Sequence, residues 1–283
     1  MSVLYVVATP IGNLGDMSPR GLEILGKADL IAAEDTRVTL KLLNHFGIHT
    51  RLVSCHQHNE ENLAPRIADR MLAEDLTAAL VTDAGTPAIS DPGTFLVKAC
   101  VERGIPVYAV PGPTAMASAL SVSGMDLREF SFYGFLPREK GALAEKLRSL
   151  PGGTRGAVFH ESPYRILDTL RVICEVLPGA RLSVSCDLTK LHELTLRGKP
   201  EDILTALEAN EKSEKGEYCV VADLRNVTLP EEKPIIQASL EARIFDLVLN
   251  GVSLRDAVEA LVEQGEKKNA VKAASLRVKD WIE

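Results

Sequence analysis

The sequence predicts an α/β protein with two α/β domains, at residues 1–122 and 123–228, a ligand cleft between them, and a small helical module at residues 235–283. Three observations predict this class. Short apolar runs of strand length alternate with helical patterns up to residue 228. Ser123–Asp126 has the small and polar residues of a crossing between domains. Leu229–Pro234 has the composition of a linker, and only helical patterns follow it.

The composition is that of a soluble globular protein, with 46% hydrophobic and 25% charged residues in a chain of 283. No apolar run approaches a membrane span, and Ser2–Ala8 lacks the basic start of a signal peptide, so we expect no membrane partner and a cytoplasmic location. The five cysteines form no CxxC pair and are expected to be buried thiols. A net charge of −7 excludes a global electrostatic footprint for nucleic acid, so RNA binding would need a local basic face or shape.

The central feature of the first domain is the loop Val81–Gly93, VTDAGTPAISDPG. It follows Thr77–Thr82, which reads as a buried parallel strand, and it precedes a helical pattern with Asp91 expected at the cap and Pro92 in the first turn. Its glycines, prolines and small residues leave the backbone bare, as a ligand loop at the carboxyl end of a strand requires. A plain strand-to-helix turn is the alternative, but such turns need only about two to six residues.

Three other strands of this domain also end at polar or small-residue loops. Val3–Ala8 precedes TPIGNLGD, which is not a nicotinamide GxGxxG fingerprint. Leu30–Ala33 ends at Glu34–Arg37, where a salt-bridged helix cap is favoured over a substrate-contact surface. Ile105–Val110 precedes Pro111–Ala115 and a small-residue helix whose free N–H groups a ligand can approach. This alternation predicts a mainly parallel, doubly wound sheet.

A possible metal motif follows the run Leu52–Cys55. His56–Asn62 contains His-x-His with nearby acids, but no third ligand has a natural spacing. We therefore favour a polar strand-end loop in which Asn59 caps the next helix, and we predict no metal.

The second domain repeats the pattern of strands that end at charged loops. The predicted strands are Phe130–Tyr133, Gly156–Phe159, Arg181–Ser185 and Tyr218–Ala222, and the charged loops are His160–Arg165, Asp187–Glu193 and Lys212–Glu217. These loops are either solvated caps or one wall of a cleft. Because polar clusters recur at strand ends that face a candidate ligand loop, the cleft is favoured.

The last part of the chain is predicted as a helix-turn-helix-like module with helices at Ile235–Asn250, Ser253–Glu263 and Lys267–Trp281. Ser253 is the expected cap of the second helix, with Asp256 three residues on. Basic side chains gather on the last helix, including Lys268 and Lys272. Contact with RNA and a role in packing or dimerisation both remain open for this helix.

Taken in order, the loops resemble those of the tetrapyrrole methylase superfamily of S-adenosylmethionine-dependent methyltransferases. The motifs TPIGNLGD, AEDTR, VTDAGTPAISDPG, VPGPTA, FHESPYR, LTK and KGE resemble one branch, the ribosomal RNA small subunit methyltransferase I family, over residues 3–226. That resemblance implies two α/β domains of tetrapyrrole-methylase type and transfer of a methyl group to the 2′-oxygen of a cytidine in the decoding region of 16S rRNA. It also implies 16S rRNA or the 30S subunit as partner, and a homodimer. Cys186–Asp187 departs from the Arg-Glu expected before LTK.

The resemblance implies that the cofactor lies in the cleft between the two domains. Its wall would comprise Pro10, Asp83, Ala84, Gly85, Ile89, Ser90, Pro113, Thr114, Ala115, Phe159, Leu188 and Glu217. The residues agree with this role, because Gly85, Gly112 and Ala115 let a bulky nucleoside approach the backbone closely.

Methyl transfer to a hydroxyl needs in-line positioning in a dry site, with or without a base. Candidate catalytic residues are Glu161, Lys190 and Glu193, and Lys190 is at least as suited to hold a phosphate. Arg37 and Arg165 suit RNA phosphates by their fork geometry, and Lys268 and Lys272 are further RNA candidates. We expect Lys190→Ala to abolish transfer while cofactor affinity is largely kept.

Two alternative functions remain at this point. One is methylation of a tetrapyrrole carbon by the same cofactor, against which stand the helical tail and the charged AEDTR and HESPYR loops, since a macrocycle requires a broad apolar trough. The other is a non-catalytic RNA- or ribosome-binding protein, which failure to bind S-adenosylmethionine in calorimetry would favour.

Overall fold

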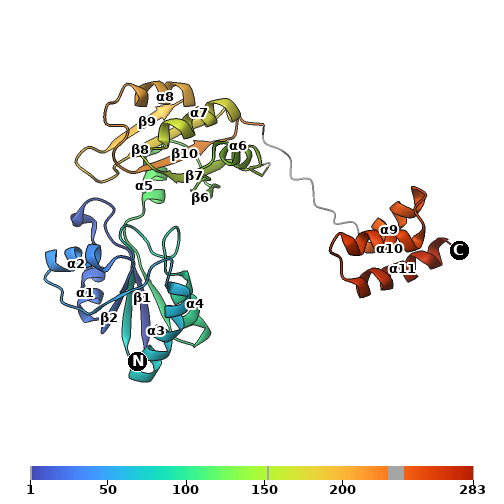
Figure 1. Cartoon of the computed structure of the whole chain (residues 1–283). Helices are drawn as coiled ribbons and strands as arrows, with labels where there is room; N and C mark the ends of the chain where they lie inside the picture. The colour runs from blue at the N-terminus through green and yellow to red at the C-terminus, as the bar shows by residue number, and fades with distance from the viewer. Residues whose placement is uncertain (1, 152, 229–238, 283) are drawn as a thin grey trace. The chain divides into compact units, whose positions relative to one another are not determined.

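The computed structural model describes residues 2–151, 153–228 and 239–282. The chain forms two compact units, residues 1–231 and 232–283, and each is described by itself. Within the described residues, the first unit contains two five-stranded sheets and the second contains three helices (Figure 1).

The first sheet is entirely parallel, with the strand order β3-β2-β4-β1-β5. Its strands are β1 (Val3–Val7), β2 (Leu30–Ala33), β3 (Leu52–Ser54), β4 (Thr77–Val81) and β5 (Val107–Val110). Ala33 pairs with both Ser54 and Val81, so the carboxyl ends of three strands meet at one edge. The prediction of a mainly parallel, doubly wound sheet is confirmed for this half of the unit.

Helices cover both faces of this sheet because side chains alternate along its strands. Helices α1 (Pro19–Lys27) and α2 (Thr36–His45) lie on one face, and α3 (Glu60–Glu74) and α4 (Thr94–Glu102) lie on the other (Figure 1). On β4, Val81 belongs to the core under α1 and α2, whereas Leu80 belongs to the core under α3 and α4.

The start of α4 differs from the sequence prediction. Asp91 does not cap this helix; the cap position is Gly93, whose φ of 128° favours glycine. The Glu60 carboxylate, at the start of α3 and 6% exposed, accepts the Gly93 N–H at 2.7 Å. A neighbouring helix therefore supplies the capping carboxylate, and Asp91 is left in the ligand loop.

The residue predicted to cap α3 occupies the cap position, but its side chain bonds the preceding loop and not the helix. Asn59 occupies the cap position without a side-chain bond to the helix. Its side chain instead accepts the His56 N–H at 2.8 Å and donates to the Ser54 carbonyl at 3.2 Å. The amide therefore stabilises the loop that precedes the helix.

The second sheet is mixed, with the order β6-β7-β10-β8-β9, and only β6 and β7 are parallel neighbours. Its strands are β6 (Ser131–Phe135), β7 (Gly156–Glu161), β8 (Arg181–Cys186), β9 (Leu194–Gly198) and β10 (Tyr218–Asp223). The four strands predicted here are confirmed. The edge strand β9 was missed, because its five half-buried or exposed residues follow a charged loop and carry a weak apolar signal.

Helices α6 (Lys140–Arg148), α7 (Ile166–Val176) and α8 (Pro200–Glu208) pack on one face of the second sheet. Helix α5 (Ala115–Val122) covers the other face, where Ala119 contacts a core formed with Val158 and Val221. Helix α5 thus follows the first sheet in the sequence but packs against the second. The domain boundary at residue 122 stays a prediction.

The second unit contains α9 (Leu240–Leu249), α10 (Leu254–Glu263) and α11 (Lys268–Ile282) around a small apolar core. Ser253 caps α10 as predicted, accepting the Asp256 N–H and donating to its carboxylate. The predicted linker Leu229–Pro234 and residues 235–238 lie outside the described residues. Among the helices that the structure describes, none has the length and apolar character to cross a membrane.

Candidate functional site

A cavity of about 350 Å³ opens in the first unit, bounded by the carboxyl-end loops of the first sheet and by β6, β7 and β10 of the second. Eight residues predicted for the cleft wall line it: Ala84, Gly85, Ile89, Ser90, Thr114, Ala115, Leu188 and Glu217. Its volume lies in the range of about 300–1,000 Å³ found for small-molecule sites. Ile89 is 55% exposed and Phe135 62%, so apolar side chains of the wall are left open to a ligand.

The floor of the cavity is backbone held in place by paired bonds. Gly85 exchanges two N–H···O bonds with Thr9, of 2.9 and 3.0 Å, and the Thr9 hydroxyl donates to the Thr82 carbonyl at 3.0 Å. Gly85 has a φ of 86°, and a Cβ there would meet Ile11 at 3.5 Å. The Thr86 hydroxyl donates to the Pro113 carbonyl at 3.2 Å. The central loop is therefore fixed to both neighbouring loops before any ligand arrives.

Backbone strain concentrates around this cavity. Of the four non-glycine residues with positive φ in the described chain, Ala88 (64°) is in the central loop, and Asp187 (53°) and Thr189 (67°) are in the loop that carries Leu188. Each such conformation costs of the order of 1–3 kcal/mol and is typical of ligand and active sites.

Four predicted wall residues do not line the main cavity. Pro10 and Asp83 border a second cavity of about 230 Å³, beside α2. Pro113 contributes the carbonyl that holds Thr86. Phe159 is 1% exposed and lies in the core under α6 and α7, because side chains alternate along β7 and its neighbour His160 faces the cavity. For these four residues a contact with the cofactor stays a prediction, through the backbone in the case of Phe159.

Several wall residues were missed from the sequence: Ile11, Thr86, Asp91, Met116, Phe132, Phe135, His160, Ser162, Pro163, Tyr218 and Cys219. Many of them belong to sequence motifs that were identified above. In those cases the motif was found, but not which of its side chains face the cavity. Phe132 and Phe135 carried no signal, because only the packing of β6 beside β7 brings them to the site.

His160 forms an apolar, ring-lined corner of the cavity. Its imidazole packs against Phe132 at 5.2 Å and Phe135 at 5.7 Å between ring centroids. Burial lowers the pKa of His160, although the charge of Glu217 opposes this. The imidazole is therefore neutral at neutral pH.

Glu161, a predicted catalytic residue, lies at the cavity but its carboxylate is already engaged. It is 2% exposed, and it accepts the Ser162 N–H at 2.7 Å and the Thr169 hydroxyl at 2.6 Å. Arg165 lies 3.3 Å from the same carboxylate and also donates to the Leu136 and Pro137 carbonyls. These contacts join the end of β7, the start of α7 and the loop after β6, and they occupy the Arg165 guanidinium that was predicted to bind RNA phosphate.

Lys190, the second candidate, lies between two carboxylates. Its ammonium is 2.8 Å from Asp187 and 2.9 Å from Glu217. Burial acts to lower the pKa of Lys190, but the hydrogen bonds and charges of the two carboxylates outweigh it and raise the pKa. The lysine is therefore a cation at neutral pH. Its stem packs over Gly12, where a Cβ would overlap it, so it also links the loop after β8 to the loop after β1.

The remaining predicted residues lie nearer the surface. Glu193 is exposed, and its carboxylate accepts the Thr189 N–H at 2.7 Å, which closes the loop. Lys268 and Lys272 are exposed on α11 of the second unit.

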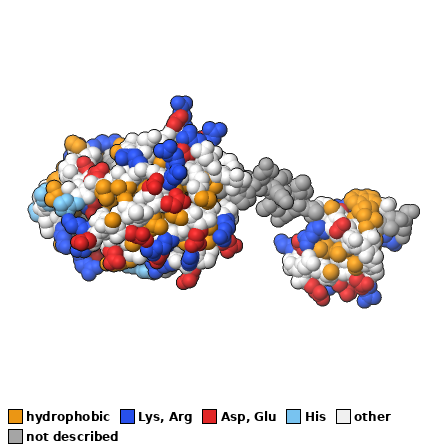
Figure 2. All heavy atoms as spheres, turned by 90° about the horizontal axis from the view of Figure 1, so that it is seen from above, with side chains coloured by type: hydrophobic (Ala, Val, Ile, Leu, Met, Phe, Trp, Pro, Cys, Tyr) orange, Lys and Arg blue, Asp and Glu red, His pale blue; other side chains and the backbone are white. Residues whose placement is uncertain are grey.

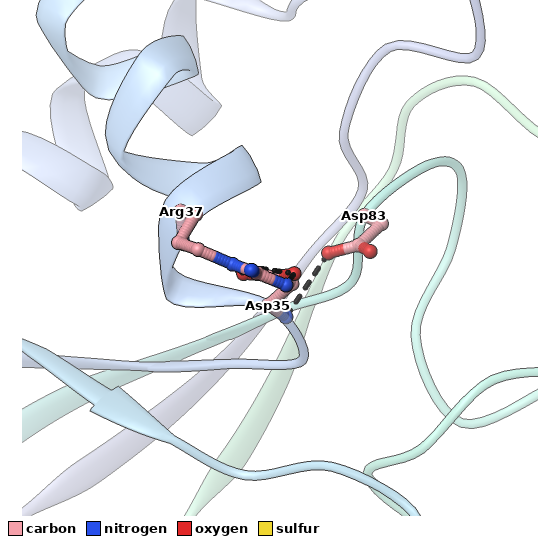
Figure 3. A network of polar contacts seen from close by, with 3 residues as sticks. All are labelled: Asp35, Arg37 and Asp83. Carbon is pink, nitrogen blue, oxygen red and sulfur yellow. Dashed lines mark hydrogen bonds and ion pairs between the residues drawn. The ribbon is translucent and has the colours of Figure 1, made fainter.

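The AEDTR segment forms the helix cap that its sequence predicted. Asp35 accepts the Arg37 N–H at 2.8 Å and pairs with the Arg37 guanidinium at 2.6 Å (Figure 3). The Arg37 hydrogen bonds lower the pKa of Asp35 to about 2. Asp83, from the central loop, accepts the Asp35 N–H at 3.0 Å, so the cap is also fixed to the ligand loop. Arg37 remains exposed, as a phosphate contact requires.

The comparisons with known proteins agree with this geometry. Residues 3–204 match the family model of tetrapyrrole (corrin/porphyrin) methylases. The chain is 40% identical over 276 residues to ribosomal RNA small subunit methyltransferase I of Vibrio cholerae, covering 95% of this chain and 92% of the relative. It is 41% identical over 266 residues to the protein of the same name from Synechocystis, covering 93% of each. The chain belongs to the ribosomal RNA small subunit methyltransferase I family.

The fold of this methyltransferase I family member is similar to those of several solved structures. Diphthine synthase aligns with a TM-score of 0.58 and 14% identity, covering 78% of this chain and 90% of that one. Uroporphyrin-III C-methyl transferase from Thermus thermophilus, solved with S-adenyl homocysteine, aligns with a TM-score of 0.52 and 14% identity, covering 78% and 97%. At these identities the likeness concerns the fold alone.

Proposed function

We propose that this protein transfers a methyl group from S-adenosylmethionine to small-subunit ribosomal RNA, at the 2′-hydroxyl of a cytidine in the decoding region of 16S rRNA. The observation that carries the proposal is the cavity floored by Gly85 and its neighbours, in a chain of this family. The sugar oxygen and the cytidine rest on the family resemblance, as does the homodimer.

The residues of the cavity fit S-adenosylmethionine. Apolar side chains such as Ile11, Met116 and Leu188 suit a nucleoside ring, and Ser90 and Thr114 offer hydroxyls to a ribose or an amino-acid tail. The wall also carries the carboxylates of Glu161 and Glu217, which are paired with Arg165 and Lys190. When bound, the cofactor supplies a methyl carbon activated by a sulfonium charge.

The chain's own contribution to the chemistry is mainly positioning. The backbone floor at Gly85 is fixed by its bonds to Thr9, so it is preorganised for a ligand. Phe132, Phe135 and His160 make one side of the cavity apolar, which limits water around the reacting atoms.

The surface of the first unit carries both basic and acidic side chains, so RNA would contact separate basic side chains and not one continuous basic patch. Figure 2 shows lysine and arginine side chains intermingled with aspartate and glutamate on the face that it presents. With a net charge of −7, affinity for RNA would come from individual basic side chains and from shape. We propose that the exposed Arg37 is one such contact, and that Lys268 and Lys272 are others.

The test is methyl transfer from labelled S-adenosylmethionine to three acceptors: 30S particles from a strain that lacks the enzyme, naked 16S rRNA and uroporphyrinogen. We expect label on the small-subunit RNA, at a cytidine ribose when the product is mapped. Label on uroporphyrinogen alone would replace the proposal by tetrapyrrole methylation. Cofactor binding in calorimetry without transfer to any acceptor, or no binding, would indicate a non-catalytic protein.

The contacts of Lys190 change the prediction made for Lys190→Ala, which had been expected to keep most of its cofactor affinity. Because its ammonium holds Glu217 at the cavity and its stem covers Gly12, we expect Lys190→Ala to abolish transfer and to weaken cofactor binding as well, by about tenfold. Lys190→Met, which keeps most of the stem and loses the charge, should bind the cofactor better than Lys190→Ala.

Calorimetry with S-adenosylmethionine and single-turnover transfer to RNA measure the two effects separately. A direct phosphate role predicts something else: unchanged cofactor affinity and a salt dependence of RNA binding that falls by about one in slope. That result would favour the role expected from the sequence.

A further inference from the structure

Asp91 is a carboxylate in the cavity wall that the described part of the chain leaves without a partner. It is half-buried in the central loop, and within the described residues no hydrogen bond or ion pair reaches its oxygens. The capping role that its sequence position suggested belongs to Glu60. A half-buried carboxylate without a donor costs free energy, so its presence here requires a reason other than stability.

The other carboxylates of the cavity wall, and the two whose charges act on Asp91, differ from it in this respect. Glu161 accepts bonds from Ser162 and Thr169, and Glu217 pairs with Lys190. Glu34 accepts bonds from Thr82 and Asp83, and Asp83 accepts the Asp35 N–H. Among these acids Asp91 alone has both oxygens available to an incoming group.

The surroundings of Asp91 make it a better proton acceptor than an exposed aspartate. Burial raises the pKa of Asp91 to about 6, and the charges of Glu34 and Asp83 add to the effect. The other titratable wall groups are His160, Glu161, Tyr218, Cys219 and Glu217. An acid with a pKa near the working pH is the most effective general base.

We propose that Asp91 accepts the proton of the ribose hydroxyl during methyl transfer, which rests on the proposed function. The O–H bond of the 2′-hydroxyl breaks as its oxygen bonds the methyl carbon, and the carbon–sulfur electron pair stays on sulfur. The proton passes to the Asp91 carboxylate and then to solvent after the product leaves. Deprotonation can be late, because the methyl group is already activated.

The experiment compares Asp91→Asn with the wild type and with Asp126→Asn, a control at an exposed ion pair outside the site. We expect Asp91→Asn to lower kcat by about 100- to 10,000-fold, with the cofactor Kd changed by less than about tenfold. Its melting temperature should equal or exceed that of the wild type near neutral pH, because the raised pKa of Asp91 makes the ionised form unfavourable to folding there. Asp126→Asn should leave kcat unchanged.

The pH profile is the readout that a structural role would not alter. The wild-type kcat should rise as pH passes through about 6 and then level off, since Asp91 accepts a proton only when ionised. That limb should be absent in Asp91→Asn, and Glu34→Gln should shift it to lower pH by removing a neighbouring negative charge.

Three results would overturn the inference: wild-type kcat in Asp91→Asn, a limb that persists in that variant, or a cofactor Kd weakened in proportion to kcat. The last would assign the carboxylate to the positive charge of the cofactor. If the wild type itself transfers no methyl group to RNA, the proposed function fails, and that outcome is distinct from these.

Discussion

Replacement of Ala115 by tryptophan is expected to abolish S-adenosylmethionine binding while the protein stays folded. Ala115 is the first residue of α5 and lines the cavity of about 350 Å³, so an indole there would occupy space that the ligand needs. We expect the Kd measured by calorimetry to rise by more than about 100-fold and transfer to RNA to be lost with it. Some loss of stability is also expected, of about 1–3 kcal/mol if the indole crowds neighbouring side chains.

The control for Ala115→Trp is Ala206→Trp, at an exposed alanine on α8 outside the cavity wall. This variant should bind S-adenosylmethionine as the wild type does. Unchanged binding in Ala115→Trp, with a melting curve that shows a folded protein, would mean that the cofactor binds elsewhere. The assignment of the cofactor to this cavity and of Asp91 as the proton acceptor would then be wrong, whereas the proposed transfer to RNA would still be tested by the acceptor assay.

Glu161→Ala is expected to have the largest effect on stability. It removes a buried carboxylate that bonds Ser162 and Thr169 and pairs with Arg165. The loss leaves the Ser162 N–H and the Thr169 hydroxyl without their acceptor and the Arg165 guanidinium without its carboxylate, which costs about 3 kcal/mol. For a unit of this size we expect the melting temperature to fall by about 6–12 °C.

Two further variants serve as controls for Glu161→Ala. Glu161→Gln keeps an acceptor and loses the charge, so its loss of stability should be smaller. Glu175→Ala, at an exposed pair with Lys140, should change stability by less than about 1 kcal/mol. If Glu161→Ala melts like the wild type and yet loses turnover, Glu161 acts in the chemistry, as the sequence had suggested, and is not a structural tie.

Much of the first domain could be predicted from the sequence because its signals are local. A buried parallel strand is a short apolar run, and Asp35 is a side chain that caps the helix that follows it. Ser253 does the same in the helical module. Asp91 shows the limit of that reasoning. It stands before a helix as a cap should, but Glu60, distant in sequence, holds the Gly93 N–H. A local pattern carries no information about such a competitor.

The residues of the cavity wall also fall into those that local motifs predict and those that only strand pairing brings to the site. Loop motifs predicted Gly85, Thr114 and Leu188 in the wall. They did not predict Phe132 and Phe135, which reach the wall only because β6 pairs with β7. The strand β9 was missed because an edge strand that is half exposed has little apolar signal.

By itself, the sequence determined the alternation of strands and helices, the bare backbone of the ligand loop, and the motifs of the methyltransferase I family. Those properties depend on neighbouring residues and on backbone freedom, so they can be read along the chain. Only the tertiary structure decided which charged groups of the site are engaged. Glu161 accepts a bond from Thr169 and Lys190 pairs with Glu217, whereas no hydrogen bond or ion pair from the described residues reaches the Asp91 carboxylate. Whether a charge in a cavity is compensated depends on residues that folding brings to it.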